Sequence, residues 1–284
     1  MTIAAQESRP RRWRLPRHPL LIIGLALVAL QIFCALAAPW IAPYGPLEQH
    51  IMARLQGPGP DFLLGTDQFG RDILSRILHG YGASLAVAAS SVGIACLVGG
   101  TLGVVAAYYR GWTDRILMRL MDILFAFPIV LLAIGIIAVL GPGQWTTAIA
   151  IGIVYVPIFA RLLRGPALVL SESEFVTAAR SVGTGDGRII RRHILPNLAS
   201  VILVQVSLSL STAILVEASL SFLGIGTQPP TPSLGLMLSE GRAYLTLSPW
   251  TSIFSGVAIL LLSFGFNLLG DALRDTLDPR LRDG

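Results

Sequence analysis

The stretch SESEFVTAARSVGTGDGRIIRRHILP, residues Ser171–Pro196, is polar and carries four arginines, yet it lies between two long apolar segments. Ser171 and Glu174 have the spacing of a capping box, in which each side chain satisfies a free backbone donor at a helix start. Gly183 is placed to end that helix in a left-handed conformation, and Asp186 is placed to begin another. The stretch therefore predicts a helix, a turn and a second helix.

Apolar side chains follow one face of the first predicted helix at i, i+3, i+4 and i+7: Phe175, Ala178, Ala179 and Val182. The second predicted helix carries Arg188, Arg191 and Arg192 and runs to Pro196. An ordered amphipathic hairpin between two membrane spans needs an apolar partner outside the membrane, and we expect that partner to be another protein. The alternative is an amphipathic loop that lies on the membrane surface.

The composition of the whole chain is that of a membrane protein. Of 284 residues, 54% are hydrophobic and 13% are charged, and the mean hydropathy is +0.70. Six stretches are long enough to cross about 30 Å of hydrocarbon at about 1.5 Å per residue. They are Leu20–Ala38, Ala83–Tyr108, Ile123–Leu140, Trp145–Leu163, Leu198–Leu220 and Trp250–Leu269. The sequence thus predicts an all-α, polytopic protein with six transmembrane helices.

The ends of these stretches carry further information. Only a Gly-Pro-Gly-Gln turn at residues 141–144 separates the third and fourth stretches, so we expect them to form an antiparallel hairpin. The first stretch is too long for a cleaved signal peptide, and no clear small-residue cleavage site follows it. We therefore expect the first stretch to remain as a span.

Prolines and glycines inside the stretches bear on helix packing. Pro128 and Pro157 each remove a backbone hydrogen bond and bend the helix, and we favour a fixed packing kink over a hinge. Gly99 and Gly103 have the small-residue spacing that lets another helix approach closely.

The basic residues predict the orientation of the chain. There is no lysine, so the chain by itself forms neither a Walker A phosphate loop nor a pyridoxal Schiff base. With the N-terminus inside, seventeen of the 21 arginines fall in internal segments, and four fall outside. The positive-inside rule then predicts that both termini and the hairpin lie in the cytoplasm.

The sequence gives no indication of catalysis or metal binding in this chain. Cys34 and Cys96 lie in predicted spans, where a small thiol is ordinary packing, and the four histidines are isolated. No serine/histidine pair, aspartate pair or zinc motif is visible within the spans. We expect no metal, no cofactor and no enzymatic activity in this chain.

Three sequence blocks and the hairpin resemble known proteins. The first block, which closely resembles the G-T-D-x-x-G-R-D motif of dipeptide, oligopeptide and nickel permeases, comprises Gly65, Thr66, Asp67, Gly70, Arg71 and Asp72. EASLSFLG at residues 217–224 followed by QPP at 228–230, and N-x-x-G-D-x-x-R-D-x-x-D-P at residues 267–279, agree with it. The hairpin resembles the EAA loop of ABC-type importer permeases, although Thr177 replaces the usual glutamate and His193 the usual isoleucine.

The resemblance implies a type I ABC importer permease core and a place in the cell (inner) membrane. It further implies a heterodimer with a second, different permease, two cytoplasmic ATPases that bind ATP and magnesium, and an extracytoplasmic substrate-binding protein. In that family the loop supplies a coupling helix that docks in an ATPase cleft. The residues expected to couple are Glu174, Phe175, Ala178, Ala179, Arg180, Val182 and Gly183.

Few positions suggest where the substrate passes. Glu217 falls near the outer end of the fifth span, where a carboxylate is costly unless it is paired or hydrated. We consider a role at the outer gate, and a structural ion pair or hydrogen bond as the favoured alternative. Other substrate-path residues would be small or polar: Gln205, Ser207, Ser211 and Asn267.

We divide the chain into four parts. Residues 1–19 form a basic cytoplasmic tail, which we interpret as an anchor to anionic lipid and not as a nucleic-acid site. Residues 20–82 hold the first span and an extracytoplasmic segment. Residues 83–272 form a five-helix domain with a cytoplasmic coupling loop at 164–197, and residues 273–284 form a cytoplasmic tail.

The predicted function is that of a permease subunit of an ATP-driven, binding-protein-dependent importer of di- or oligopeptides. The same importer type carrying nickel or glutathione is the first alternative. An ion-coupled secondary transporter would be expected to carry ionisable residues near the membrane midplane, and Glu217 fits that pattern only in part. A membrane scaffold is disfavoured by the three blocks.

Overall fold

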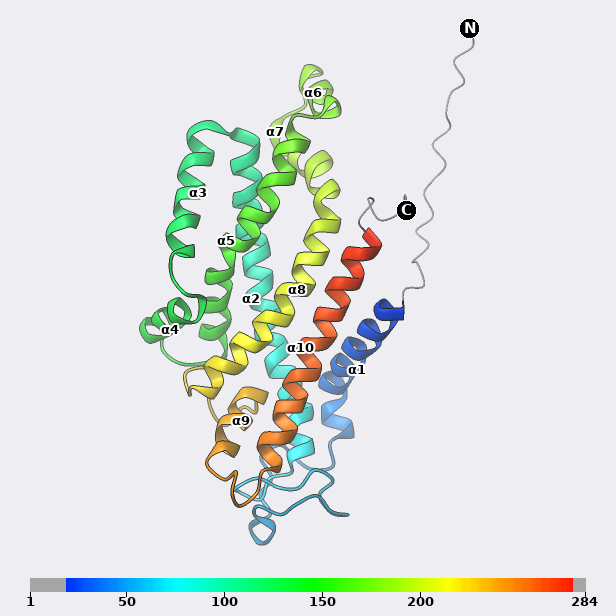
Figure 1. The fold of residues 1–284 in the computed structure, drawn as a ribbon, viewed down its shortest axis with the longest axis vertical. Coiled ribbons are helices and arrows are strands. Elements are labelled where there is room, and N and C mark those ends of the chain that lie inside the picture. Colours follow the sequence, from blue (N-terminus) through cyan, green and yellow to red (C-terminus); the bar gives the residue numbers. More distant parts are fainter. Residues whose placement is uncertain (1–18, 278–284) are drawn as a thin grey trace.

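The computed structural model describes residues 19–277, and within them the regular structure is almost entirely helical (Figure 1). The α-helices are α1 (Pro19–Ile41), α2 (Ile73–Tyr109), α3 (Gly111–Phe125), α4 (Ile129–Leu140), α5 (Gln144–Ser171), α6 (Glu174–Ser181), α7 (Asp186–Ile189), α8 (Leu195–Phe222), α9 (Leu234–Arg242) and α10 (Trp250–Leu277). A short 3-10 helix, η1, spans Ile51–Ala53, and a π-helical segment, η2, spans Ile190–Ile194. Most of the predicted basic tail and the end of the third block lie outside the described residues.

Five helical runs are long and apolar enough to cross a membrane. They are Pro19–Ile41, Ile73–Tyr109, Gln144–Ser171, Asp186–Phe222 and Trp250–Leu277. Each of these five runs contains one predicted stretch. The predicted stretch without such a run is the third, Ile123–Leu140. The all-α membrane fold is therefore confirmed with five spans, or with six if the bent pair of α3 and α4 counts as one.

The predicted third span, Ile123–Leu140, is wrong as a single helix. The chain breaks between Phe125 and Ile129, and α3 and α4 meet at an angle of 91°. Pro128 lacks a backbone N–H, and its ring disfavours helical geometry at the residue before it, so the helix ends instead of bending. The apolar run continues as α4 up to Gly141, which has a φ of +89° and opens the turn predicted at residues 141–144.

Four helical runs extend well beyond the predicted boundaries. α2 has 37 residues, so it is about 55 Å long, and it runs without a break through the domain boundary predicted at residue 82. α5 continues to Ser171, and α7, η2 and α8 form one run from Asp186, so the predicted loop at 164–197 shortens to residues 172–185. Pro196 lies inside this run, directly after the π-helical segment Ile190–Ile194, so it does not end a separate helix. α10 likewise continues to Leu277, past the start of the predicted C-terminal tail.

The tightest helix contact joins α2 to α5. A Cβ atom at Gly99 would overlap the carbonyl oxygen of Val156, and one at Gly103 would overlap that of Ala160. Backbone therefore lies directly against backbone, as the glycine spacing predicted. Pro157 is buried at the same contact inside α5, which stays helical through it.

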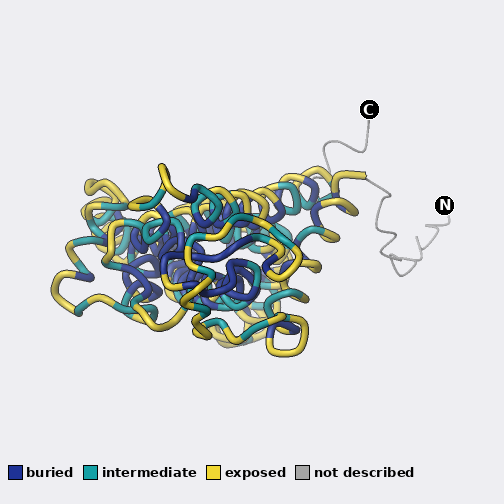
Figure 2. The backbone as a smooth tube through the Cα atoms, turned by 90° about the horizontal axis from the view of Figure 1, so that it is seen from below, coloured by how far each residue is buried: buried dark blue, intermediate teal, exposed yellow. Residues whose placement is uncertain are grey.

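The remaining long helices pack around this pair. α10 lies between α8 and α1, and α1 lies at the edge of the bundle (Figure 1). Seen from below, the buried backbone gathers in the middle of the bundle and the exposed backbone forms its rim (Figure 2). The rim includes large apolar side chains such as Leu25, Phe33 and Leu36 of α1, as expected for a protein that faces lipid.

The α2–α5 contact predicts opposite effects for two alanine substitutions on the same helix. Gly103→Ala places a methyl group against the Ala160 carbonyl and should lower the free energy of unfolding by about 1–3 kcal/mol. Gly93→Ala meets nothing within 4 Å and should raise it by about 0.5–1 kcal/mol through helix propensity. Thermal unfolding in detergent measures both, and equal effects would contradict the close contact.

Candidate functional site

The helical hairpin, defined here as residues 172–194, stands at one end of the molecule (Figure 1). Its first helix, α6, ends at Gly183, whose φ is +79°. The Gly183 N–H donates to the Arg180 carbonyl at 2.9 Å, and the Thr184 N–H donates to the Ala179 carbonyl at 3.0 Å. This pair of bonds is a Schellman motif, so the predicted left-handed cap at Gly183 is confirmed.

The predicted start of the hairpin is wrong. Ser171 ends α5, where its hydroxyl donates to the Leu168 carbonyl and accepts a bond from Arg110 at 3.0 Å. Ser173 is instead the N-cap residue of α6, and its side chain makes no capping bond. A capping box would need Ser171 to lie just before the first residue of α6, but Ser171 is the last residue of α5.

The predicted second N-cap also shifts by one residue. Gly185 occupies the N-cap position of α7, and Asp186 is the first helical residue. Its carboxylate accepts a 2.6 Å hydrogen bond from the hydroxyl of Tyr108, at the end of α2. The Arg180 guanidinium stacks over the Tyr108 ring at 4.7 Å, so both halves of the hairpin are tied to α2.

The residue of α6 that packs inward, Val176, is not part of the predicted apolar stripe. Val176 is fully buried and packs in a cluster with Val104, Leu163 and Ile189, and half-buried Ala179 packs against it. The other three members of the predicted stripe, Phe175, Ala178 and Val182, are exposed, Val182 by 81%. Glu174 and Arg180 are exposed as well. The sequence missed Val176 because only the tertiary contact shows which edge of a short helix faces inward.

A buried ion cluster lies at the opposite end of the molecule. Asp67 is fully buried and accepts hydrogen bonds from Arg71 at 2.6 Å and from Arg76 at 2.5 Å. Glu240 of α9 accepts from the same two arginines, at 3.1 Å and 2.9 Å. Two carboxylates thus meet two guanidinium groups, and the loop before α2 is fastened to both α2 and α9.

The other residues of the predicted external motif shape the turn that holds Asp67. Gly65 and Gly70 have φ of +83° and +76°, a conformation that glycine adopts without strain. The Thr66 hydroxyl accepts a bond from the Gln56 N–H and donates to the Ala53 carbonyl. Asp72 caps α2 by accepting from the Ser75 N–H at 2.8 Å.

Sequence reasoning missed Arg76 and Glu240 as members of this cluster. Arg76 lies just beyond the first sequence block, and Glu240 lies 169 residues from Arg71, so no local pattern connects them.

Glu217 lies inside the helix packing. Its side chain is fully buried, and it accepts hydrogen bonds from the hydroxyls of Ser84 at 3.0 Å and Ser221 at 2.8 Å. The Thr227 hydroxyl lies 3.4 Å away. α2, α8 and the loop after α8 therefore meet at this carboxylate.

The other predicted substrate-path residues do not gather at one site. Ser211 is buried and its hydroxyl lies 2.9 Å from that of Ser263 in α10. Ser207 is buried and donates to the Leu203 carbonyl within α8, and half-buried Gln205 donates to the Ser209 hydroxyl. Asn267 of α10 is exposed.

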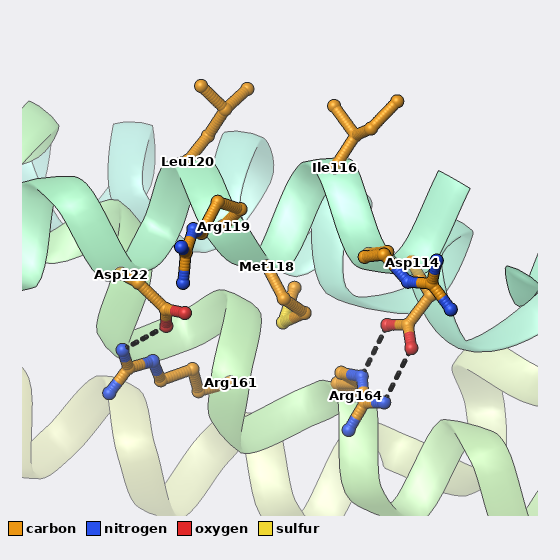
Figure 3. A pocket seen from close by; sticks show the side chains of 9 residues that line it. Asp114, Ile116, Met118, Arg119, Leu120, Asp122, Arg161 and Arg164 are labelled. Atoms are coloured by element: carbon orange, nitrogen blue, oxygen red, sulfur yellow. Dashed lines mark hydrogen bonds and ion pairs between the residues drawn. The ribbon is translucent and has the colours of Figure 1, made fainter. Parts of the chain in front are cut away.

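A charged groove of about 840 Å³ lies beside α3 and α5, and the sequence did not predict it. Arg164 of α5 donates two bonds to Asp114 at 2.5 Å and 2.6 Å, and Arg161 donates to Asp122 at 2.6 Å (Figure 3). Met118 lies between the two ion pairs. Among the described residues, no group of three or more His, Cys, Asp or Glu side chains could hold a metal ion.

The ion cluster predicts a large effect for one isosteric substitution. Asp67→Asn removes a buried negative charge and leaves Arg71 and Arg76 with one carboxylate between them. Breaking a buried ion pair costs about 3–5 kcal/mol, so the free energy of unfolding should fall by that amount. Asp61→Asn is the matched control because Asp61 is exposed in the same loop. Similar melting temperatures of the two variants would refute a stabilising role.

Comparison with known proteins places the chain in a family. Residues 99–283 match the family described as binding-protein-dependent transport system inner membrane component. Residues 11–58 match the N-terminal transmembrane domain of oligopeptide transport permease C.

Two curated relatives match nearly the whole chain. The dipeptide transport system permease protein DppC of Alkalihalophilus pseudofirmus is 46% identical over 269 residues, which cover 95% of this chain and 88% of the relative. The glutathione transport system permease protein GsiD of Pectobacterium atrosepticum is 46% identical over 273 residues, which cover 95% of this chain and 90% of the relative.

A solved structure supports the fold. A chain of the MetNI methionine ABC transporter, in an inward-facing conformation, aligns with a TM-score of 0.58 at 17% identity, covering 72% of this chain and 97% of that one. Components of the matched family work with an ATPase and a binding protein and perform no catalysis themselves. The chain therefore belongs to the binding-protein-dependent transport system inner membrane components, as an ABC importer permease of the oligopeptide permease C type.

Proposed function

We propose that this chain is a permease subunit of an ATP-driven importer of di- or oligopeptides. The relatives named for dipeptide and peptide transport cover 95% of the chain at 46% identity, which supports this substrate class. Glutathione is itself a tripeptide, and the equal identity to a glutathione permease makes it the first alternative. Nickel is a more distant alternative that rests on the external motif alone.

The proposed orientation follows from the arginines. Both termini and the hairpin lie in the cytoplasm, and the ion cluster around Asp67 lies outside. The chain then crosses the membrane six times, with α3 and α4 together forming the third, broken crossing. The partners are a second permease, two ATPases that bind ATP and magnesium, and an extracytoplasmic binding protein. No nucleic acid takes part.

The observation that carries the coupling mechanism is the exposed apolar face of α6. Phe175 of α6 and Val182, the residue that follows α6, are exposed by 45% and 81%. The opposite face of α6 packs through Val176 against the body of the protein. Water contact with large apolar side chains is unfavourable, so this face fits a protein partner. We assign it to a cleft in the ATPase, with Glu174 and Arg180 available for polar contacts at its edge.

The proposed transmission of movement uses the ties of the hairpin to the long helices. The bonds from Tyr108 to Asp186 and the stacking of Arg180 hold the hairpin against α2. The helical run from Asp186 to Phe222 continues into the membrane without a turn. A push on α6 by a closing ATPase would therefore move α8 as one body, and would change access to the space between the two permeases.

The substrate path remains a proposal with two accessible members. Gln205 and Asn267 keep exposed or half-exposed side chains, whereas Ser207 and Ser211 are used in packing contacts within this chain. The hydroxyl groups around Glu217 favour the structural alternative for that residue, because they satisfy both carboxylate oxygens without a substrate.

Coupling is tested by adding charge to the exposed face of α6. Val182→Glu should abolish uptake while the protein stays in the membrane, because the carboxylate would be buried in the ATPase cleft without a partner. Thr177→Glu is the matched control: it adds the same charge to another exposed position of α6 and should leave uptake intact. Uptake and the amount of ATPase in the purified complex are measured together.

The turn provides a second pair of variants for the same test. Gly183→Val forces a β-branched residue into a left-handed conformation at a cost of about 1–2 kcal/mol and should also abolish uptake. Gly185→Ala should be harmless because the φ of Gly185 is −66°. Normal uptake with Val182→Glu and Gly183→Val, with the ATPases still attached, would refute the coupling role.

The substrate is tested by uptake in a strain that lacks the gene. We expect radiolabelled di- and oligopeptides to enter only when the chain is restored, together with its partner subunits. Peptides should compete with one another, and nickel should not compete. Uptake of glutathione without uptake of other peptides would select the first alternative, and ion-coupled uptake without ATPases would refute the importer.

A further inference from the structure

A second groove, of about 580 Å³, lies where the hairpin joins α8. Its lining consists of Gly187, Arg188, Arg191, Arg192 and Pro196. The three arginines are exposed, and within residues 19–277 none of them has a salt-bridge partner. No acidic side chain lines the groove, since Asp186 bonds to Tyr108.

The chemistry of this groove fits a phosphate group. Arginine presents a planar fork of N–H donors that matches phosphate oxygens in pairs. Gly187 has no side chain, and a Cβ atom there would meet nothing within 4 Å, so space is open between the arginines. Three unpaired cations around a space of this size form a receptor for an anion that carries several acceptor oxygens.

The position of the groove along α8 indicates where such an anion comes from. Arg192 lies six residues, or about 9 Å along a helix, before Leu198, the predicted start of the apolar stretch, which we take as the edge of the hydrocarbon. The headgroup layer on each side of a bilayer is about 5–8 Å deep. An arginine side chain extends several ångströms beyond its backbone, so Arg191 and Arg192 reach the level of the lipid phosphates.

The surface of α8 below the groove is apolar and exposed. Ala199 and Leu203 follow the arginines along the helix, and Leu203 is 53% exposed. Such a surface accommodates an acyl chain whose headgroup lies in the groove. We infer that Arg188, Arg191 and Arg192 bind the headgroup of an anionic phospholipid at the rim where α8 enters the membrane.

An acidic surface of the ATPase is the competing occupant. The exposed apolar residues of α6 lie before the turn at Gly183, whereas the three arginines lie after it, on the helical run that enters the membrane. Their closeness to the bilayer and the apolar surface below them favour lipid.

The test uses the assembled complex in nanodiscs. We expect Arg191→Gln/Arg192→Gln to weaken the preference for phosphatidylglycerol over phosphatidylcholine by about 25-fold, at about fivefold for each arginine near a membrane surface. Native mass spectrometry of retained lipid measures this preference. Arg115→Gln/Arg119→Gln is the matched control, because it removes two exposed arginines of α3 that have no salt-bridge partner among the described residues. The control should keep the preference, and Arg191→Lys/Arg192→Lys should keep most of it.

Each other outcome overturns the inference. Equal lipid retention in the two glutamine variants would show that the groove has no special affinity. Loss of the ATPases with unchanged lipid retention would assign the arginines to the ATPase. Displacement of phosphatidylglycerol by inorganic phosphate would assign the groove to a free anion. If the glutamine variant fails to fold, the unaltered complex decides: a lipid preference that survives an approximately tenfold rise in salt would exclude an electrostatic headgroup site.

Discussion

The contact of α2 with α5 is the constraint on which the rest of the structure depends. At Gly99 and Gly103 the two backbones touch, so these helices lie closer together than any residue larger than glycine would permit. α2 then extends as one rod of 37 residues to both ends of the molecule. One end begins at the cap made by Asp72, beside the ion cluster, and the other end carries Tyr108, which ties down the hairpin.

Among the described residues, the buried charges have side-chain partners within the chain, whereas several exposed arginines have no salt-bridge partner. The ion cluster matches two carboxylates with two arginines at the end of the bundle, where removing one partner would leave a buried charge. Glu217 is also fully buried, and its partners are hydroxyl groups instead of a cation. Arg188, Arg191 and Arg192, between α6 and α8, are exposed and have no salt-bridge partner within residues 19–277.

The break between α3 and α4 contrasts with the continuous helical run from α7 to α8. Between α3 and α4 the chain turns by 91° at Pro128, so movement of one helix need not move the other. Between α7 and α8 the helix passes through the π-helical segment at Ile190–Ile194 and remains one run. The proposed coupling of the hairpin to α8 depends on this continuous connection.

Composition and hydropathy were sufficient to predict the all-α membrane fold and five of its spans, because each apolar helix satisfies its own backbone hydrogen bonds and needs only length and apolarity. The cap at Gly183 was predictable because glycine adopts the left-handed backbone conformation without strain, whatever the rest of the chain does. Whether a proline breaks a helix was not predictable, since α3 ends just before Pro128 whereas α5 stays helical through Pro157 and Pro166. The true ends of α5 and α8 were not predictable either, because they depend on what the next residues pack against. The pairing of Arg71 and Arg76 with Glu240, and the inward position of Val176, exist only because distant segments meet in the folded chain. Short stretches of sequence determine local backbone preferences, whereas contacts between distant residues form only when the helices pack.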